Sequence, residues 1–365
     1  MNDEKFLVAL HRGMNLTFAR FGKLQKFFGG DWRATFDGKI KDFQAADLDP
    51  RGIEKFLSVR EKLDPDWEIE QLEKCGARVL VFGRENFPQN LESIHNPPAL
   101  LFCRGEFLDT DFPAIAVVGS RKLTSYGRRA GEKIVGEIAA AGITIVSGLA
   151  FGADTLAHQI AVKNGARTIA VLGNGIDTVY PQQNAKFAAE FLAKNCGAVL
   201  SEYLPGTEVR PENFPVRNRI VAGLAKAVIV LEAAEKSGSL ITAELAVEMG
   251  RDIFAVPGEI FAENSAGTNA LIFKSQAAPA LSGEQILENL GLKNLAPKKA
   301  AQLAIPTTST EAEILKLLES GEKVHLDDLV RNSPFPAPVT SSTISILEIK
   351  GLVRNLGQQI YVKNV

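Results

Sequence analysis

The chain has 365 residues, of which 45% are hydrophobic, and a formal net charge of −2 at pH 7. This length allows about two or three domains with sizeable cores. The near-neutral charge excludes a positive field over the whole surface, so any attraction to nucleic acid must come from a local basic face.

Residues 1–65 are predicted to form a small helical domain of the helical-hairpin or SAM-like kind, because their apolar residues follow a helical period. Asp49 and Pro50 are expected to open one of its helices as N-cap and first helical residue. A hairpin turn of this kind sometimes holds nucleic-acid backbone. We favour the alternative, a packing domain without a ligand.

Residues 66–290 show short apolar runs that alternate with amphipathic segments of helix length. This alternation predicts an α/β fold with a parallel sheet that helices cover on both faces. Two early runs, residues 78–82 and 100–103, flank a proline-rich connection and are expected at an edge of the sheet. The runs expected in the centre are residues 114–118, 143–146, 168–172, 198–202, 227–231 and 253–256.

Residues 291–309 lose this pattern and gain Pro, Lys and Thr, which indicates a linker. Residues 310–365 then read as three helices and a hairpin, which is typical of a winged-helix domain. In a DNA-reading version the third helix presents basic residues. Protein contact or packing is at least as consistent with this tail, because its third helix offers Ser341, Ser342, Thr343, Ser345 and Glu348.

Small residues follow three of the predicted central strands. Glycines end strands in most α/β proteins, so one such turn alone indicates nothing. Three in one sheet predict a crevice at the carboxyl ends, where helix amino termini favour an anion and phosphate is the first ligand to consider. The residues are Gly119, Ser120 and Arg121, then Ser147 and Gly148, then Gly173, Asn174 and Gly175.

The segment RPENFPVRNRIVAGL, residues 210–224, places Arg217, Asn218 and Arg219 in the first turn of a predicted helix. Cations there oppose the helix dipole, which makes sense if an anion binds between them. The alternative is that both arginines pair with Glu202 or Glu232, and from this stretch alone the two interpretations are equally good.

A second phosphate cradle is predicted in the segment EKSGSLITAEL, where hydroxyls and a glycine open a helix directly after a strand. A serine-rich cap without a ligand is the alternative. Aromatic rings among cations suit single-stranded nucleic acid, and Phe214 beside the arginines is the best candidate ring. The cradle residues are Lys236, Ser237, Gly238, Ser239 and Thr242, and a further basic set is Arg121, Lys122, Arg128 and Arg129.

Several motifs are missing from the sequence. It holds no Walker A motif and no complete dinucleotide fingerprint, so no cofactor is expected. The four histidines show no zinc-binding spacing, and no nucleophile elbow supports a catalytic serine, so neither metal nor catalysis is expected. The three cysteines form no CxxC pair and no membrane-spanning run or signal peptide is visible, so we expect a cytoplasmic protein with reduced thiols.

Long motifs between residues 87 and 290 resemble the DNA-processing protein A family, also called DprA or Smf. They include GSR followed by YG, SGLAFGADTLAH, AVLGNGIDTVYPQQN, FPVRNRIVAGL, EAAEKSGSLITAELA and GRDIFAVPGEI, in that order. The terminal segments resemble the family's helical module and winged-helix tail more loosely.

This resemblance implies an extended Rossmann-like core that binds single-stranded DNA without base specificity, as a homodimer. It implies that the protein protects incoming strands in natural transformation and helps to load the RecA recombinase, without catalysis. The family's DNA pocket maps onto Gly119 to Arg121, onto Phe214 and Arg217 to Arg219, and onto Lys236 to Ser239. Arg210 corresponds to a basic residue that many relatives carry before the Phe-Pro pair.

The second hypothesis comes from a different class. Nucleotide-monophosphate phosphoribohydrolases use a related fold, and their pocket for one phosphate and one base would look similar near Gly119. Such an enzyme needs an acidic pair near the glycine-rich turn, where this chain has Arg217, Asn218 and Arg219. A third hypothesis makes the terminal domains the active parts and the core their scaffold.

Overall fold

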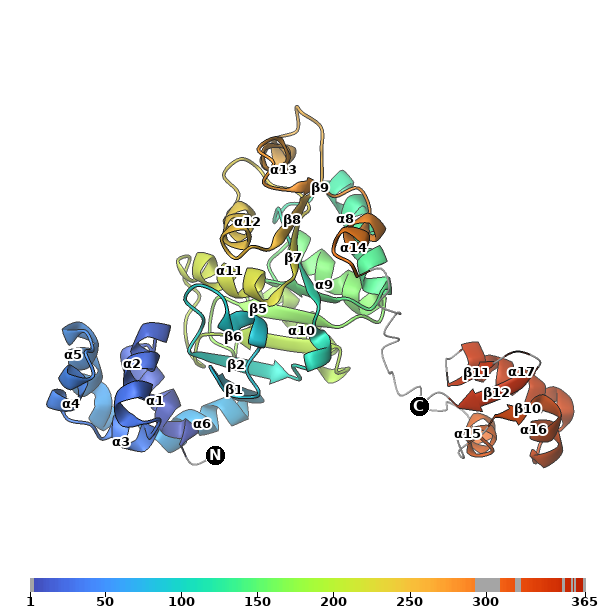
Figure 1. The fold of residues 1–365 in the computed structure, drawn as a ribbon, viewed down its shortest axis with the longest axis horizontal. Coiled ribbons are helices and arrows are strands. Elements are labelled where there is room, and N and C mark those ends of the chain that lie inside the picture. The colour runs from blue at the N-terminus through green and yellow to red at the C-terminus, as the bar shows by residue number, and fades with distance from the viewer. Residues whose placement is uncertain are drawn as a thin grey trace. The chain divides into compact units, whose positions relative to one another are not determined.

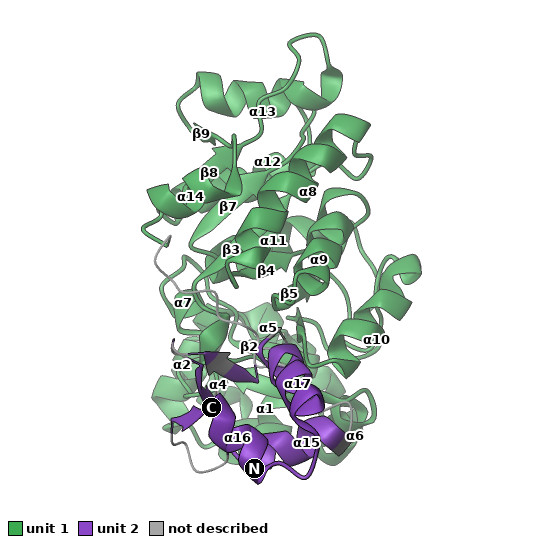
Figure 2. Cartoon of the chain, turned by 90° about the vertical axis from the view of Figure 1, so that its right-hand side faces the viewer, with its two compact units in different colours: residues 1–298 green, residues 299–365 purple. Residues whose placement is uncertain are grey.

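The structure is a computed structural model that describes residues 3–292, 309–318, 323–349, 352–355, 357 and 359–363. It divides into two compact units, residues 1–298 and residues 299–365 (Figure 2). Residues 293–308, most of the linker predicted over residues 291–309, lie outside the described residues. None of the described helices is both long and apolar enough to cross a lipid bilayer.

The first unit begins with the predicted helical domain, whose core is rich in aromatic rings. Phe21, Phe43 and Phe56 are fully buried, and Phe21 stacks on Trp32 with ring centroids 5.1 Å apart. Such rings bury a large apolar area for each residue, which a small domain needs. The helices are α1 (Glu4–Met14), α2 (Phe18–Phe28), α3 (Trp32–Phe36), α4 (Ile40–Ala45), α5 (Pro50–Val59) and α6 (Pro65–Lys74).

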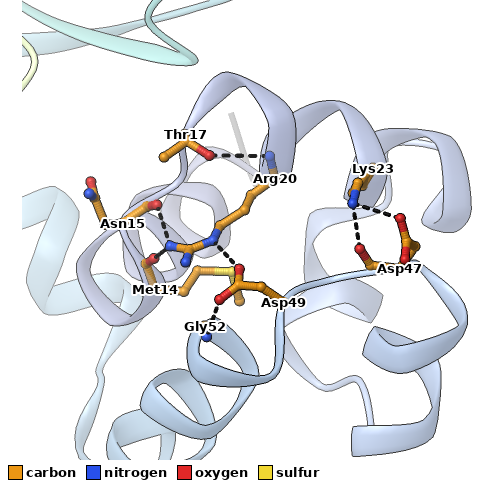
Figure 3. Close-up of polar contacts among 8 residues, drawn as sticks. All are labelled: Met14, Asn15, Thr17, Arg20, Lys23, Asp47, Asp49 and Gly52. Atoms are coloured by element: carbon orange, nitrogen blue, oxygen red, sulfur yellow. Dashed lines mark hydrogen bonds and ion pairs between the residues drawn. The ribbon is translucent and has the colours of Figure 1, made fainter.

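The predicted cap of α5 is confirmed and is part of a closed polar cluster (Figure 3). Asp49 accepts a hydrogen bond from the backbone N–H of Gly52 at 2.8 Å, and Pro50 is the first helical residue. The other carboxylate oxygen of Asp49 accepts from Arg20 Nε at 2.8 Å, while the same guanidinium donates to the carbonyls of Met14 and Asn15. These partners join the α1–α2 turn to the start of α5.

The core of the first unit is a nine-stranded sheet in the order β1-β2-β6-β5-β4-β3-β7-β8-β9. From β6 to β9 neighbouring strands are parallel, whereas β1, β2 and β6 pair antiparallel at one edge. The strands are β1 (Ala77–Val81), β2 (Leu100–Gly105), β3 (Ala114–Val118), β4 (Thr144–Ser147), β5 (Thr168–Leu172), β6 (Gly197–Ser201), β7 (Ala227–Val230), β8 (Asp252–Ala255) and β9 (Ala278–Pro279).

Helices cover both faces of the central sheet, as the apolar runs predicted (Figure 1). On β3 the side chains of Ile115 and Val117 pack with α8, α9 and α14, while those of Ala114, Ala116 and Val118 pack on the opposite face with α11 and α12. Successive side chains of a strand point to opposite faces of the sheet. Because helices cover both faces, every residue of β3 is buried. The helices are α7 (Gln89–Glu92), α8 (Ser125–Ala140), α9 (Ala153–Lys163), α10 (Ala185–Ala193), α11 (Asn213–Leu224), α12 (Gly238–Glu248), α13 (Glu263–Phe273) and α14 (Gly283–Asn289).

The predicted fold class is confirmed, and the differences are small. The two early runs form β1 and β2 at a sheet edge, and the six central runs match β3 to β8 within two residues at each end. The two-residue strand β9 was not predicted, because Ala278 and Pro279 carry no strand pattern and pair only with the end of β8.

The second unit contains the winged-helix domain that the tail predicted. Helix α16 starts after His325, whose ring accepts a hydrogen bond from the backbone N–H of Asp327. The first helix of the domain begins at Ser309, and Thr310 is its second residue. The elements are α15 (Ser309–Lys316), β10 (Val324–His325), α16 (Leu326–Asn332), α17 (Ala337–Ile349), β11 (Val353–Asn355) and β12 (Ile360–Lys363), with the three strands in the order β10-β12-β11.

Candidate nucleic-acid interface

A cavity of about 620 Å³ lies where the strand order of the sheet reverses. Strand β3 pairs with β4 on one side and with β7 on the other, so the connections after these strands leave in opposite directions. Ligands of open α/β sheets bind at such switch points, outside the carboxyl ends of the strands. The lining residues include Gly119, Arg121, Ala150, Asp154, Tyr180, Val209, Pro211, Phe214, Arg217, Asn218, Ser237, Gly238, Ser239, Ile241 and Thr242.

The ring of Phe214 lies close to two guanidinium groups in this cavity. The Cζ of Arg121 is 5.6 Å from the ring centroid and the Cζ of Arg217 is 5.8 Å from it. Tyr180 adds a second ring, with its centroid 6.0 Å from that of Phe214. The close approach of Phe214 to Gly173 leaves little room for a side chain there, since a Cβ would lie 3.1 Å from the ring. The cavity therefore combines aromatic surface with positive charge.

Arg217 is almost fully buried, and backbone carbonyls hold its guanidinium in place. Its Nη1 donates to the carbonyl of Gly148 at 2.8 Å and to that of Val171, and its Nε donates to Asn218 Oδ1 at 3.2 Å. Burial lowers the pKa of Arg217 to about 10, which leaves it charged at neutral pH. Gly148 has to be a glycine, because a Cβ would collide with this guanidinium.

Asp154 is the acidic residue among those that line the cavity, and its carboxylate is already engaged. Its Oδ2 accepts hydrogen bonds from the backbone N–H groups of Gly148 at 3.1 Å and Ala150 at 3.3 Å. Burial raises the pKa of Asp154, while the charge of Arg217 acts in the opposite direction. This geometry makes Asp154 an acceptor that holds the backbone of the loop after β4.

The turn between β7 and α12 presents hydroxyls at a helix amino terminus, as predicted. Ser237 caps α12 by accepting from the backbone N–H of Ser239, and the two hydroxyl oxygens lie 2.7 Å apart. Thr242 is buried one turn further along, and it lines the cavity with Gly238. Hydroxyls at the start of an eleven-residue helix, where the helix dipole is positive, are a suitable surface for an anion.

Glu232, in the segment after β7, holds the loop that follows β3. The backbone N–H of Ser120 donates to the carbonyl of Glu232 at 2.7 Å, and that of Thr124 donates to the Glu232 carboxylate at 3.0 Å. Glu232 is itself almost fully buried. These contacts place Arg121 at the cavity while Ser120 lies beside it.

Three candidate site residues have side chains that are occupied elsewhere. Ser147 Oγ donates to the carbonyl of Val117 at 2.6 Å, and the Asn174 amide donates to the carbonyls of Gly175 and Thr178. Arg219 donates through Nη2 to both carboxylate oxygens of Glu202, at 2.6 and 2.8 Å. The arginine pairing considered as the alternative is therefore what the structure shows for Arg219, whereas Arg217 faces the cavity.

Two predicted cations are exposed and do not line the cavity. Arg210 lies on the segment before α11, with Glu208 4.0 Å away. Lys236 is exposed on the turn that leads to α12. Both flank residues that do line the cavity, Val209 and Pro211 for the first and Ser237 for the second.

Sequence reasoning missed part of the lining. Tyr180, Val209 and Ile241 come from three separate segments and each is more than a third exposed. Tyr180 was the one with a usable signal, because it is an aromatic residue in the Gly- and Pro-containing loop after β5, at the same sheet edge. Nothing in the local sequence distinguishes Val209 or Ile241 from ordinary surface residues.

Two family models match the chain. The model for DNA recombination-mediator protein A matches residues 78–291, and the model for the DprA winged helix domain matches residues 298–359.

Relatives with similar sequences carry the names DprA and Smf. Protein Smf of Synechocystis sp. is 38% identical over 258 residues, which are 70% of this chain and 64% of that protein. DNA processing protein DprA of Streptococcus pneumoniae is 45% identical over 201 residues, 55% of this chain and 70% of that protein. The chain thus spans slightly less than two thirds of the length of the Synechocystis relative.

Solved structures agree with these matches. The X-ray structure of S. pneumoniae DprA superposes with a TM-score of 0.67 at 34% identity, covering 78% of this chain and 97% of that one. DprA from Helicobacter pylori, whose structure is described as giving insight into its single-stranded DNA binding mode, superposes with a TM-score of 0.53 at 32% identity, covering 59% and 95%. The family-model match over more than half of the residues, with these likenesses, shows that the chain belongs to the DprA/Smf family of DNA recombination-mediator proteins.

Proposed function

We propose that this protein binds single-stranded DNA in the cavity at the switch point, without reading its bases. The observation that carries the proposal is the ring of Phe214 with the guanidinium groups of Arg121 and Arg217 at 5.6 and 5.8 Å from its centroid. Every base has a face that stacks on such a ring, and every phosphate has a charge that a guanidinium neutralises. The binding of single-stranded DNA by the H. pylori relative supports the same proposal.

In this arrangement the cavity residues divide into two groups. Phe214 and Tyr180 offer ring faces to bases, while Arg121 and the start of α12 offer donors to phosphates. Arg217 contributes mainly its charge, because its Nη1 and Nε already donate to protein acceptors. None of these contacts depends on base identity.

The test is fluorescence anisotropy of a labelled oligothymidylate at two salt concentrations, with wild type, Phe214→Ala and Arg121→Gln. Loss of the ring should weaken binding by about 1–3 kcal/mol, which is about 5- to 150-fold, and leave the salt dependence unchanged. Loss of the Arg121 charge should lower the slope of log K against log salt by about 0.7.

Matched controls are Phe27→Ala and Arg51→Gln, which change exposed residues of the helical domain. They should bind DNA as wild type does. Salt-independent binding, or equal losses in test and control variants, would contradict the proposed site.

We further propose that the protein acts in recombination as the family resemblance implies. It would protect incoming single strands in natural transformation and help to load RecA on them, as a cytoplasmic protein without catalysis. The acidic pair that a phosphoribohydrolase needs has only one candidate among the lining residues, Asp154, and two backbone N–H groups already hold its carboxylate. The geometry therefore favours binding over hydrolysis.

We also propose a homodimer that uses an apolar surface around α13. Ile260, Phe261 and Phe273 are 82%, 95% and 89% exposed, the highest values among the large apolar side chains of the described residues. Ile260 and Phe261 lie just before α13, and Phe273 is its last residue. Large apolar side chains that are exposed to this extent are typical of protein interfaces. Two joined cavities would hold one long strand with higher avidity than either alone.

A further inference from the structure

A second hollow, of about 610 Å³, runs between α8 and α9. Helix α8 contributes the residues at positions 128, 132, 133, 136, 137 and 140, which lie along one side of that helix. Helix α9 contributes Leu156, Gln159, Ile160 and Lys163 from the facing side, with Asn164 just beyond its end. The hollow is therefore a groove parallel to two packed helices.

The cations of this groove have no acidic partner. Arg128, Lys133 and Lys163 are exposed, and none of them forms an ion pair with any of the described residues. Of the two acidic lining residues, Glu137 accepts from the backbone N–H of Gly283 at 2.6 Å and so caps α14. Glu137 keeps its negative charge in this role and Glu132 carries another, so the lining holds three positive charges against two negative ones.

Both helices of the groove begin at the edge of the sheet where the cavity lies. Asp154, in the first turn of α9, lines the cavity, and α8 begins four residues after Arg121, which lines it too. Lys122, which follows Arg121, is exposed, and so is Arg128, the first groove residue of α8. From there the groove follows α8, whose sixteen residues correspond to about 24 Å of helix. A strand leaving the cavity along this path would meet cations at both ends of the groove.

The lining suits an extended polyanion better than a peptide. Leu156 and Ile160 are only 5% and 7% exposed, so these two apolar side chains are largely unavailable as anchors for a peptide. Peptide-binding grooves rely on such apolar anchors. Gln159 and Asn164 add polar groups between the cations.

We propose that the α8–α9 groove is a second contact for single-stranded DNA, which holds the phosphates of a strand as it leaves the cavity. This proposal rests on the proposed function of the cavity. Lys133 and Lys163 would bind the strand by neutralising its phosphates. This attraction requires neither base stacking nor a helix amino terminus.

The test compares oligothymidylates of about 6 and about 25 nucleotides, the shorter within the range that one compact site covers. The variant is Lys133→Gln with Lys163→Gln. The matched control is Lys186→Gln with Lys194→Gln, which removes two exposed lysines in and just after α10. Binding is measured by anisotropy over a range of salt concentrations, with circular dichroism to check the fold.

The groove variant should bind the short oligonucleotide as wild type does and the long one about fivefold more weakly at low salt. The slope of log K against log salt for the long one should fall by about 1.4, or 0.7 for each phosphate released. The control should match wild type with both lengths. If wild type binds both lengths and the groove variant matches it with both, the groove proposal is wrong while the cavity proposal stands.

Two other outcomes would also overturn the groove proposal. Failure of wild type to bind either length would remove the proposed function on which it rests. Binding of polyglutamate that depends on Lys133 and Lys163, without any effect of the variant on the long oligonucleotide, would make the groove a protein-docking surface.

Discussion

The two arginines in the first turn of α11 differ in what their side chains contact. Arg217 points into the cavity, while Arg219 pairs with Glu202 and has Nε and Nη1 without a hydrogen-bond partner among the described residues. Removing one partner of such a buried pair leaves an uncompensated charge, which costs stability rather than affinity. Arg121 and Phe214 are therefore better probes of the cavity than Arg217 or Arg219.

Behind the cavity, His158 is completely buried on α9 and neutral. Thr168 Oγ1 donates to the carbonyl of Ile145 at 2.9 Å, so it accepts from the Nδ1–H of His158 at 2.6 Å, and the proton is on Nδ1. The Nε2 atom has no partner among the described residues. Burial, with a smaller effect from the charge of Arg217, lowers the pKa of His158 from its ordinary 6.5 to about 3.

This histidine should make the folded state sensitive to acid. Below pH 6.5 the unfolded chain takes up a proton that the folded chain does not, so stability is lost as pH falls toward 3. Between pH 7 and pH 5 the loss should be about 2 kcal/mol from His158 alone. Urea unfolding at both pH values should show that loss in wild type, and His158→Gln should show correspondingly less.

Two other groups have shifted pKa values but do not affect the comparison. His11 is also buried, which lowers its pKa to about 4 and gives it the same sign. Burial raises the pKa of Asp154, which gives the opposite sign. Both are present in wild type and in the His158→Gln variant, so the difference between the two proteins isolates His158. Equal acid sensitivity would show that His158 is not responsible.

At the scale of single elements, α17 is the recognition-helix position of the winged-helix domain but carries no cation. Its sequence, APVTSSTISILEI, contains no Lys, Arg or His, and Val339 and Ile346 are 40% and 43% exposed on it. A helix that enters the major groove normally brings positive charge to the phosphates and bases. This surface therefore fits protein contact better than DNA reading.

A chain that ends after residue 298 should keep the DNA affinity of the full chain. The cavity lies entirely in the first unit, and its lining includes no residue of the tail. The affinity for an oligothymidylate should stay within about twofold, with the same salt slope, because no phosphate contact is lost. A large loss of affinity in anisotropy measurements, with the core still folded, would assign DNA binding to the tail.

At the scale of the whole molecule, the proposed dimer predicts how affinity depends on strand length. Phe261→Asp with Phe273→Asp should give a monomer, since two carboxylates would replace the apolar centre of the surface. Light scattering measures the mass directly. The monomer should bind a short oligonucleotide as wild type does and lose about a hundredfold in affinity for one that spans both cavities.

Two results would contradict this dimer. The first is a wild-type protein that is a monomer at micromolar concentration. The second is a double variant that is still a dimer. A matched control is Val247→Asp, which places one carboxylate on an exposed apolar site of α12.

The order of elements, the parallel core and the position of the crevice could be predicted from the sequence because each depends on local patterns. Near-continuous apolar runs such as residues 114–118 indicate strands buried on both faces, and the small residues after them indicate the edge where ligands bind. The serines before α12 signal a helix cap in the same local way. The family motifs could be recognised because they too are local sequence patterns.

Only the tertiary structure decided which polar side chains face the cavity. Ser147, Asn174 and Arg219 stand in the right segments, yet Ser147 and Arg219 pair with distant residues and Asn174 pairs with carbonyls of its own loop. Tyr180 and Ile241 join the cavity because separate segments meet there. Local sequence specifies the turn that carries a side chain, whereas its direction depends on the neighbours that compete for its hydrogen bonds.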